Sequence, residues 1–163
     1  MIPKPVIAAV NGHAIAGGCI LASACDYRIM AEGTGRIGIP ELVVGVPLPA
    51  LPLQIITARV PDSALRDLLF SGRTVHADEA RTLGLVDATC GQEMLLDRAS
   101  EMADTLAAIP PAAFALTKEA FYLPTLERTN QLADVNARVV DQWMKQHTYD
   151  RIRSYLDRTV GKR

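Results

Sequence analysis

Apolar residues are arranged differently in the two parts of the chain. Up to about Cys90 they form short runs separated by glycine and proline. The run at residues 6–10 (VIAAV) is short and begins and ends with valine, which is typical of a buried strand, and residues 26–31 (DYRIMA) have a similar character. Between them, residues 18–24 are rich in alanine and lack strand alternation, which predicts a short buried helix. This alternation of strands and helices is typical of an α/β fold.

Two further helices have marked ends. In "PDSALRDLLFSG", Asp62 or Ser63 is a candidate N-cap, and Gly72 is typical of a helix end. In "HADEARTLGLV", acidic residues fall in the expected first turn and Gly84 stands at the expected end. Residues 85–86 (LV) that follow predict another strand.

After Gly91 the apolar spacing becomes helical. Leucine, alanine or methionine at positions 95, 99, 102 and 106 predicts one amphipathic helix, and Pro110 and Pro111 predict a break followed by a new helix. A later stripe on an otherwise polar, long helix consists of Leu132, Val135, Val139 and Trp143. We therefore expect residues 1–91 to form a core that carries the functional site, and residues 92–163 to form a helical region. Residues 161–163 are expected to be a loose tail.

Composition narrows the possible functions. The 163 residues are 49% hydrophobic and 21% charged with a net charge of −1, which is ordinary for a globular protein and gives no general attraction to nucleic acid or anionic membranes. No apolar run approaches the roughly 18 residues of a membrane span, and the first residues lack the pattern of a signal peptide. Three cysteines and three widely separated histidines predict reduced thiols and no metal site. We expect a cytoplasmic protein.

Two adjacent glycines between the first strand and the first helix are the main candidate for a site. Gly17 and Gly18 lie where the helix begins, and the first N–H groups of a helix have no internal partner and carry partial positive charge. Glycine lets a ligand approach such a backbone closely. The segment lacks the phosphate-binding glycine patterns, whereas its apolar flanks suit a carbonyl oxygen on an apolar chain. The alternative is that both glycines only permit tight packing.

Three segments in order resemble one known family. "KPVIAAVNGHAIAGGCILASACDYRI", "GRIGIPELVVGVP" and "SGRTVHADEARTLGLVD" are similar to the signatures of the crotonase family, the enoyl-CoA hydratases and isomerases. The resemblance implies a partial crotonase-like ββα spiral followed by C-terminal oligomerisation helices, usually in a trimer or hexamer. It also implies an acyl-CoA thioester substrate and no cofactor beyond the coenzyme A that the substrate carries.

The resemblance assigns roles to individual residues. Gly17 is at the position whose N–H holds the thioester oxygen, and Glu41 in "GIPEL" is at the position of a catalytic glutamate. Gly18 and Ile20 are expected to contact the substrate. Family hydratases also carry a glutamate three residues after the oxyanion glycine, where this chain has Ile20. Hydration needs two groups to manage water and the α-proton, whereas isomerisation needs one base. The resemblance therefore implies an enoyl-CoA isomerase with Glu41 as acid–base; by itself, this carboxylate would also fit a solvated loop residue.

Two other departures from the family concern the loop after Glu41 and the start of the chain. The loop "VPLPALPLQI" replaces a glycine-rich segment, and its Leu48 is a candidate either for the acyl pocket or for the core. Family members have a substantial spiral segment before the strand that follows Lys4, which supplies the first oxyanion N–H and most of the CoA contacts. We therefore expect a chain that lacks this part and associates strongly with further copies.

Alternatives to the isomerase remain open from the sequence. They are a hydratase-like enzyme and a non-catalytic remnant that binds acyl groups or oligomerises. His13, beside the glycine turn, is expected to be a partly buried residue with a backbone partner rather than a base. Asp26 is expected to end the short helix or to pair locally.

Overall fold

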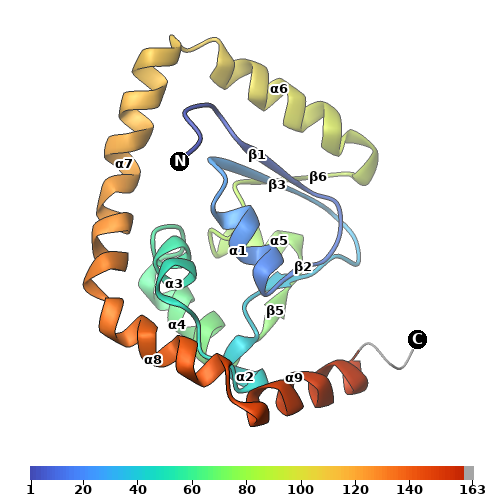
Figure 1. Ribbon diagram of the computed structural model, residues 1–163. Coiled ribbons are helices and arrows are strands. Elements are labelled where there is room, and N and C mark those ends of the chain that lie inside the picture. The colour runs from blue at the N-terminus through green and yellow to red at the C-terminus, as the bar shows by residue number, and fades with distance from the viewer. Residues whose placement is uncertain (160–163) are drawn as a thin grey trace.

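The computed structural model describes residues 1–159. Short strands and helices alternate in the first part, and helices make up the last part (Figure 1). In chain order the elements are β1 (Ile7–Val10), β2 (Ala14–Ile15), α1 (Gly17–Ser23), β3 (Tyr27–Ala31), β4 (Ile37–Gly38), α2 (Glu41–Val44), α3 (Ala50–Thr57), α4 (Asp62–Ser71), β5 (Thr74–Val75), α5 (Ala77–Thr82), β6 (Ala88–Cys90), the 3₁₀ helix η1 (Gln92–Met94), α6 (Leu95–Ala107), α7 (Pro111–Gln131), α8 (Ala133–Trp143) and α9 (Gln146–Thr159). The mixed α/β architecture expected from the sequence is confirmed.

The strands form two small sheets. In the first, β3 lies between β1 and β6 and pairs with both in parallel, with Ile7 opposite Tyr27 and Ile29 opposite Ala88. In the second, β4 lies between β2 and β5, parallel to β2 and antiparallel to β5. Parallel neighbours need a crossover connection, and α1 is part of the one between β1 and β3.

Two apolar clusters hold these layers together. The larger lies between the sheets and helices α1, α3, α4 and α5, and its fully buried side chains include Cys19, Met30, Ile37, Ile39, Ile56, Leu68 and Leu85. The smaller lies where α6 covers the first sheet, and it is built on Ile29, Ala31 and Leu95. The helical stripe predicted from position 95 onward therefore supplies one wall of this second cluster.

Helices α6 to α9 form an arc around the rest of the molecule (Figure 1). Helix α7 packs against α3, α8 against α3 and α7, and α9 against α2. Many large apolar side chains on these helices stay exposed, among them Leu96, Leu116, Phe121, Val140 and Leu156. No helix within residues 1–159 is both long enough and apolar enough to cross a membrane.

Local predictions in the first part are mostly confirmed. Residues 6–10 contain β1, residues 26–31 contain β3, and the helix expected at 18–24 is α1, which begins one residue earlier. Gly72 ends α4 with a φ of 61°, the left-handed conformation that favours glycine. Pro111 is at the start of α7, as predicted.

Two local predictions were wrong. The N-cap of α4 is Pro61 rather than Asp62 or Ser63, and Asp62 is already the first helical residue; the proline holds the extended conformation from which the helix starts. Residues 85–86 are buried but form no strand, because the strand that pairs with β3 begins at Ala88. The expected tail at residues 161–163 lies outside the described residues.

Candidate functional site

The second sheet brings the two predicted catalytic positions to one edge. Strands β2 and β4 run in the same direction, with Ile15 opposite Gly38. The N–H of Ala16 continues the pairing by donating to the carbonyl oxygen of Gly38 at 2.9 Å. Helix α1 begins at Gly17 directly after β2, and α2 begins at Glu41 shortly after β4. Both helices therefore start at the carboxyl edge of a parallel strand pair, where α/β proteins commonly bind ligands.

A strained turn sets the direction of α1. Ala16 has a φ of 55°, and among residues 1–159 no other non-glycine residue has a positive φ. Such a conformation costs on the order of 1–3 kcal/mol and persists where its surroundings hold it. Here the N–H of Ala16 is bound by Gly38, and its carbonyl oxygen accepts the N–H of Ile20 at 3.1 Å. The turn leaves the N–H of Gly17 in the first turn of α1, without an acceptor inside the helix.

Packing does not explain the glycine pair. A Cβ atom at Gly17 would meet nothing within 4 Å, and one at Gly18 would make an ordinary contact of 3.9 Å with the Cβ of Ala14. Neither residue has a positive φ, and both are exposed. The space beside Gly17 is therefore open to a ligand, and the tight-packing alternative loses its support.

Glu41 is half-buried at the start of α2. Its Oε2 is buried and has no hydrogen-bond partner among the described residues. Burial raises the pKa of this carboxyl above its ordinary value, although a hydrogen bond from its own backbone N–H acts in the opposite direction. Glu41 is thus no solvated loop carboxylate: it is a group that gives up and takes back a proton nearer neutral pH than an exposed glutamate does.

Helix α1 carries no charged side chain, and its Cys19 lies near enough to Glu41 to feel the charge of that carboxylate. Cys19 is fully buried, and burial, with a smaller effect from the negative charge of Glu41, raises the pKa of its thiol to about 12. Ile20 is half-buried and packs against the main core. The arrangement therefore offers one carboxylate beside the glycine turn.

Leu48 lies in the loop before α3 and is 9% exposed. Its burial agrees with the core role, and an acyl contact at this position remains a prediction.

Two distant helices hold α2 in place. Gly45 ends α2 with a φ of 84°, and the side chain of Arg151 from α9 lies over it, 2.7 Å from where a Cβ would stand. On the other side, Val43 of α2 occupies the space next to Gly72 at the end of α4. The position of Glu41 thus depends on contacts with both the core and the C-terminal helices.

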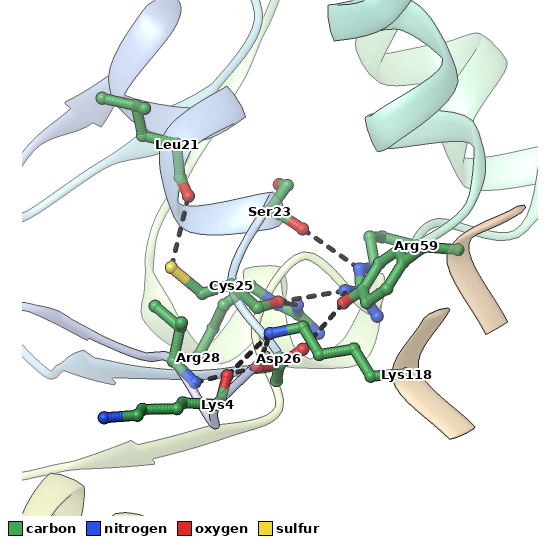
Figure 2. A network of polar contacts seen from close by, with 10 residues as sticks. Lys4, Leu21, Ser23, Cys25, Asp26, Arg28, Arg59 and Lys118 are labelled. Carbon is green, nitrogen blue, oxygen red and sulfur yellow. Dashed lines mark hydrogen bonds and ion pairs between the residues drawn. The ribbon is translucent and has the colours of Figure 1, made fainter. Parts of the chain in front are cut away.

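The sequence did not predict a polar network at the opposite end of α1 (Figure 2). Asp26 does not pair locally: its Oδ2 accepts the ammonium of Lys118 at 2.6 Å and the N–H of Val6 at 2.8 Å. Its Oδ1 accepts the hydroxyl of Tyr122 at 3.1 Å. Two of the partners lie on α7, more than ninety positions away, so no sequence spacing marks them.

His13 was expected to be partly buried, but it is exposed. Its Nδ1 accepts the backbone N–H of Arg36 at 3.2 Å, so the expected backbone partner is present. The ring stands beside the turn and makes no contact with Glu41 that would give it a catalytic part.

Comparisons with known proteins identify the family of this chain. Residues 1–160 match the family model described as Enoyl-CoA hydratase/isomerase. A relative from Thermus thermophilus is 43% identical over 117 residues, which are 72% of this chain and 46% of that protein. The short-chain-enoyl-CoA hydratase of Clostridium acetobutylicum is 37% identical over 74% of this chain and 46% of its own length. The chain therefore spans about half the length of these relatives.

A solved structure extends the likeness to the fold. The apo structure of an enoyl-CoA isomerase from Mycobacterium tuberculosis superposes with a TM-score of 0.77 and 31% identity. The match covers 83% of this chain and 60% of the other. It confirms the expected fold class, including the C-terminal helices.

Proposed function

Because the chain belongs to the enoyl-CoA hydratase/isomerase family, we propose that it moves the double bond of an enoyl-CoA thioester from the 3- to the 2-position, with Glu41 as the single acid–base group. Two observations together carry the proposal: Glu41 is half-buried with an Oε2 that has no hydrogen-bond partner among the described residues, and position 20 is an isoleucine. One proton carrier suffices for this reaction, whereas adding water needs a second group to position and activate the water.

Two groups share the proposed chemistry: the side chain of Glu41 and the backbone N–H of Gly17. The carboxylate of Glu41 takes a proton from C2 of the 3-enoyl thioester, and the electrons move into an enolate whose negative charge lies on the thioester oxygen. The N–H of Gly17 donates to that oxygen, and the bound acyl chain, packed on the alanine and isoleucine side chains around the turn, excludes water and strengthens the interaction. Glu41 then returns the proton at C4, which leaves the conjugated 2-enoyl thioester. No atom is gained or lost.

A hydratase-like activity is the second candidate, and the name of the C. acetobutylicum relative favours it. The two activities differ in substrate and product. An isomerase converts 3-enoyl-CoA into the conjugated thioester without forming 3-hydroxyacyl-CoA. A hydratase consumes 2-enoyl-CoA and forms the hydroxy product.

Parallel incubations separate the candidates. The purified chain is incubated with 3-enoyl-CoA and, separately, with 2-enoyl-CoA, and the products are resolved by liquid chromatography. We expect 2-enoyl-CoA from the first and no 3-hydroxyacyl-CoA from the second. Formation of 3-hydroxyacyl-CoA from 2-enoyl-CoA at a comparable rate would replace the proposal with the hydratase. If neither substrate is converted by the folded chain, the non-catalytic alternative holds.

The assembly state is also a proposal. The exposed apolar side chains on α6 to α9 support a homo-oligomer, a trimer or a hexamer, because apolar surface of this extent is usually covered by another chain. Light scattering of the purified protein tests this, and a monodisperse monomer would contradict it.

A further inference from the structure

A cavity lies at the opposite end of α1 from the glycine turn. It has a volume of about 350 Å³, within the range of about 300–1,000 Å³ typical of small-molecule pockets. The N-terminal segment, the end of α1, α3 and α7 enclose it, and its apolar wall consists of Met1, Ile2, Val6, Leu51, Ile55 and Leu126. It shares none of these residues with the Glu41 site.

Two cations belong to the lining of this cavity, on the side where the polar network of Figure 2 lies. The ammonium of Lys118 donates to Asp26 and, at 2.9 Å, to the carbonyl oxygen of Lys4. An ammonium has three N–H donors, so one remains uncommitted. Lys118 is 8% exposed, and its ammonium also lies 5.8 Å from the centre of the Phe114 ring.

Arg59 is the second cation. Its Nε donates to the carbonyl oxygen of Ser23 at 3.0 Å, and its Nη2 donates to that of Cys25 at 3.0 Å and to the hydroxyl oxygen of Tyr122. Within residues 1–159 the Nη1 atom of Arg59 makes no hydrogen bond, and it is not fully buried. A ligand can therefore reach it.

The charges at the cavity do not cancel. The ion pair between Lys118 and Asp26 is internally balanced. Among the described residues, Arg59 takes part in no ion pair, because its acceptors are two carbonyl oxygens and a hydroxyl. A half-buried guanidinium with an uncommitted Nη1 beside an apolar wall is a site for an anion, since a carboxylate oxygen accepts a charge-assisted hydrogen bond from such a donor.

We propose that this cavity binds a medium-chain fatty acid, with the carboxylate on Nη1 of Arg59 and the hydrocarbon chain along Leu51, Ile55 and Leu126. The chain of such an acid removes the exposed apolar wall from water, and its carboxylate supplies the negative charge that Arg59 lacks as a partner. A headgroup such as a phosphate would satisfy the donors but leave the apolar wall uncovered. The binding does not depend on the enoyl-CoA chemistry at Glu41.

Calorimetric titration with octanoate and with 1-octanol tests both parts of the proposal. We expect octanoate to bind at least tenfold more tightly than octanol, because only the carboxylate pairs with Arg59. Arg59→Gln should remove that preference. Circular dichroism and thermal melts establish that this variant is folded.

A matched pair of variants on α7 provides a test that leaves Arg59 intact. Leu126 lines the cavity and is 45% exposed, whereas Leu123, one turn earlier, is 49% exposed and does not line it. We expect Leu126→Glu to weaken octanoate binding at least tenfold and Leu123→Glu to leave it within twofold.

Three results would overturn the proposal. They are absence of octanoate binding to the folded protein, equal binding of octanol, and equal effects of the two glutamate variants. Light scattering is measured on the same samples. An oligomer that does not bind octanoate would also overturn the proposal, and would mean that a second copy of the chain covers the cavity.

Discussion

Replacing Lys118 by methionine should destabilise the fold strongly while barely changing the volume of the side chain. The side chains of Lys118 and Asp26 are 7% and 12% exposed, and their charged atoms lie 2.6 Å apart. Removing one member of a buried ion pair costs about 3–5 kcal/mol, because the remaining charge stays buried without its partner. Asp26 keeps the N–H of Val6 and the hydroxyl of Tyr122. We therefore expect a loss of about 3 kcal/mol, at the lower end of that range.

Urea unfolding followed by circular dichroism measures this loss. Lys145→Met is the matched control, since Lys145 is exposed and bonds only a nearby glutamine, and surface changes of this kind usually stay within about 0.5 kcal/mol. The double variant Asp26→Asn with Lys118→Met should be more stable than the sum of the single losses by roughly 0.5–3 kcal/mol, because the second change removes the stranded charge. A loss below about 1 kcal/mol for Lys118→Met, or strict additivity, would refute the reasoning.

Three further changes test the site. Glu41→Gln should raise the free energy of unfolding near neutral pH, and the gain should vanish below the ordinary carboxyl pKa of 4.5. Burial raises the pKa of this carboxyl in the folded protein, so the native state of the wild type loses stability as the pH rises from 4.5 through the raised pKa. Urea titrations at several pH values that show no such trend would contradict it. Ile20→Glu should add some formation of 3-hydroxyacyl-CoA from 2-enoyl-CoA, detected by chromatography, and should lower the free energy of unfolding in urea by about 1–3 kcal/mol. Unchanged products would mean that the site does not lack a second carboxylate. Gly72→Ala should cost about 1–3 kcal/mol and lower turnover, because the left-handed φ is strained for alanine and the new methyl group would displace Val43 of α2; an unfolding curve identical to that of the wild type would argue against this contact.

Features set by neighbouring residues could be predicted from the sequence. Gly72 ends a helix because glycine favours the left-handed φ of that position, and Pro111 starts one because its fixed φ suits the first turn. The strand predicted at residues 85–86 was wrong, because local character alone does not decide it. Their apolar character correctly indicates burial, but a strand also needs a partner, and β3 pairs with residues that come later.

Features set by the tertiary structure could not be predicted. Asp26 was expected to pair locally, but it pairs with Lys118 on α7. Six helices lie between these two residues in the sequence. The burial of Glu41 likewise depends on α4 and α9, which approach α2 from two sides. The sequence motif located the carboxylate, and the fold determines its pKa.

Turnover of the Glu41→Gln variant tests the central claim most directly. The absorbance of the conjugated 2-enoyl thioester is followed after the purified chain is mixed with 3-enoyl-CoA, with Glu32→Gln, an exposed carboxylate outside the site, as the control. A positioned acid–base group contributes typically 10²–10⁴-fold to the rate. We predict a rise in absorbance for the wild type and the control, and a rate at least about 10²-fold lower for Glu41→Gln. An unchanged rate in Glu41→Gln would contradict the assignment of Glu41 as the single acid–base group.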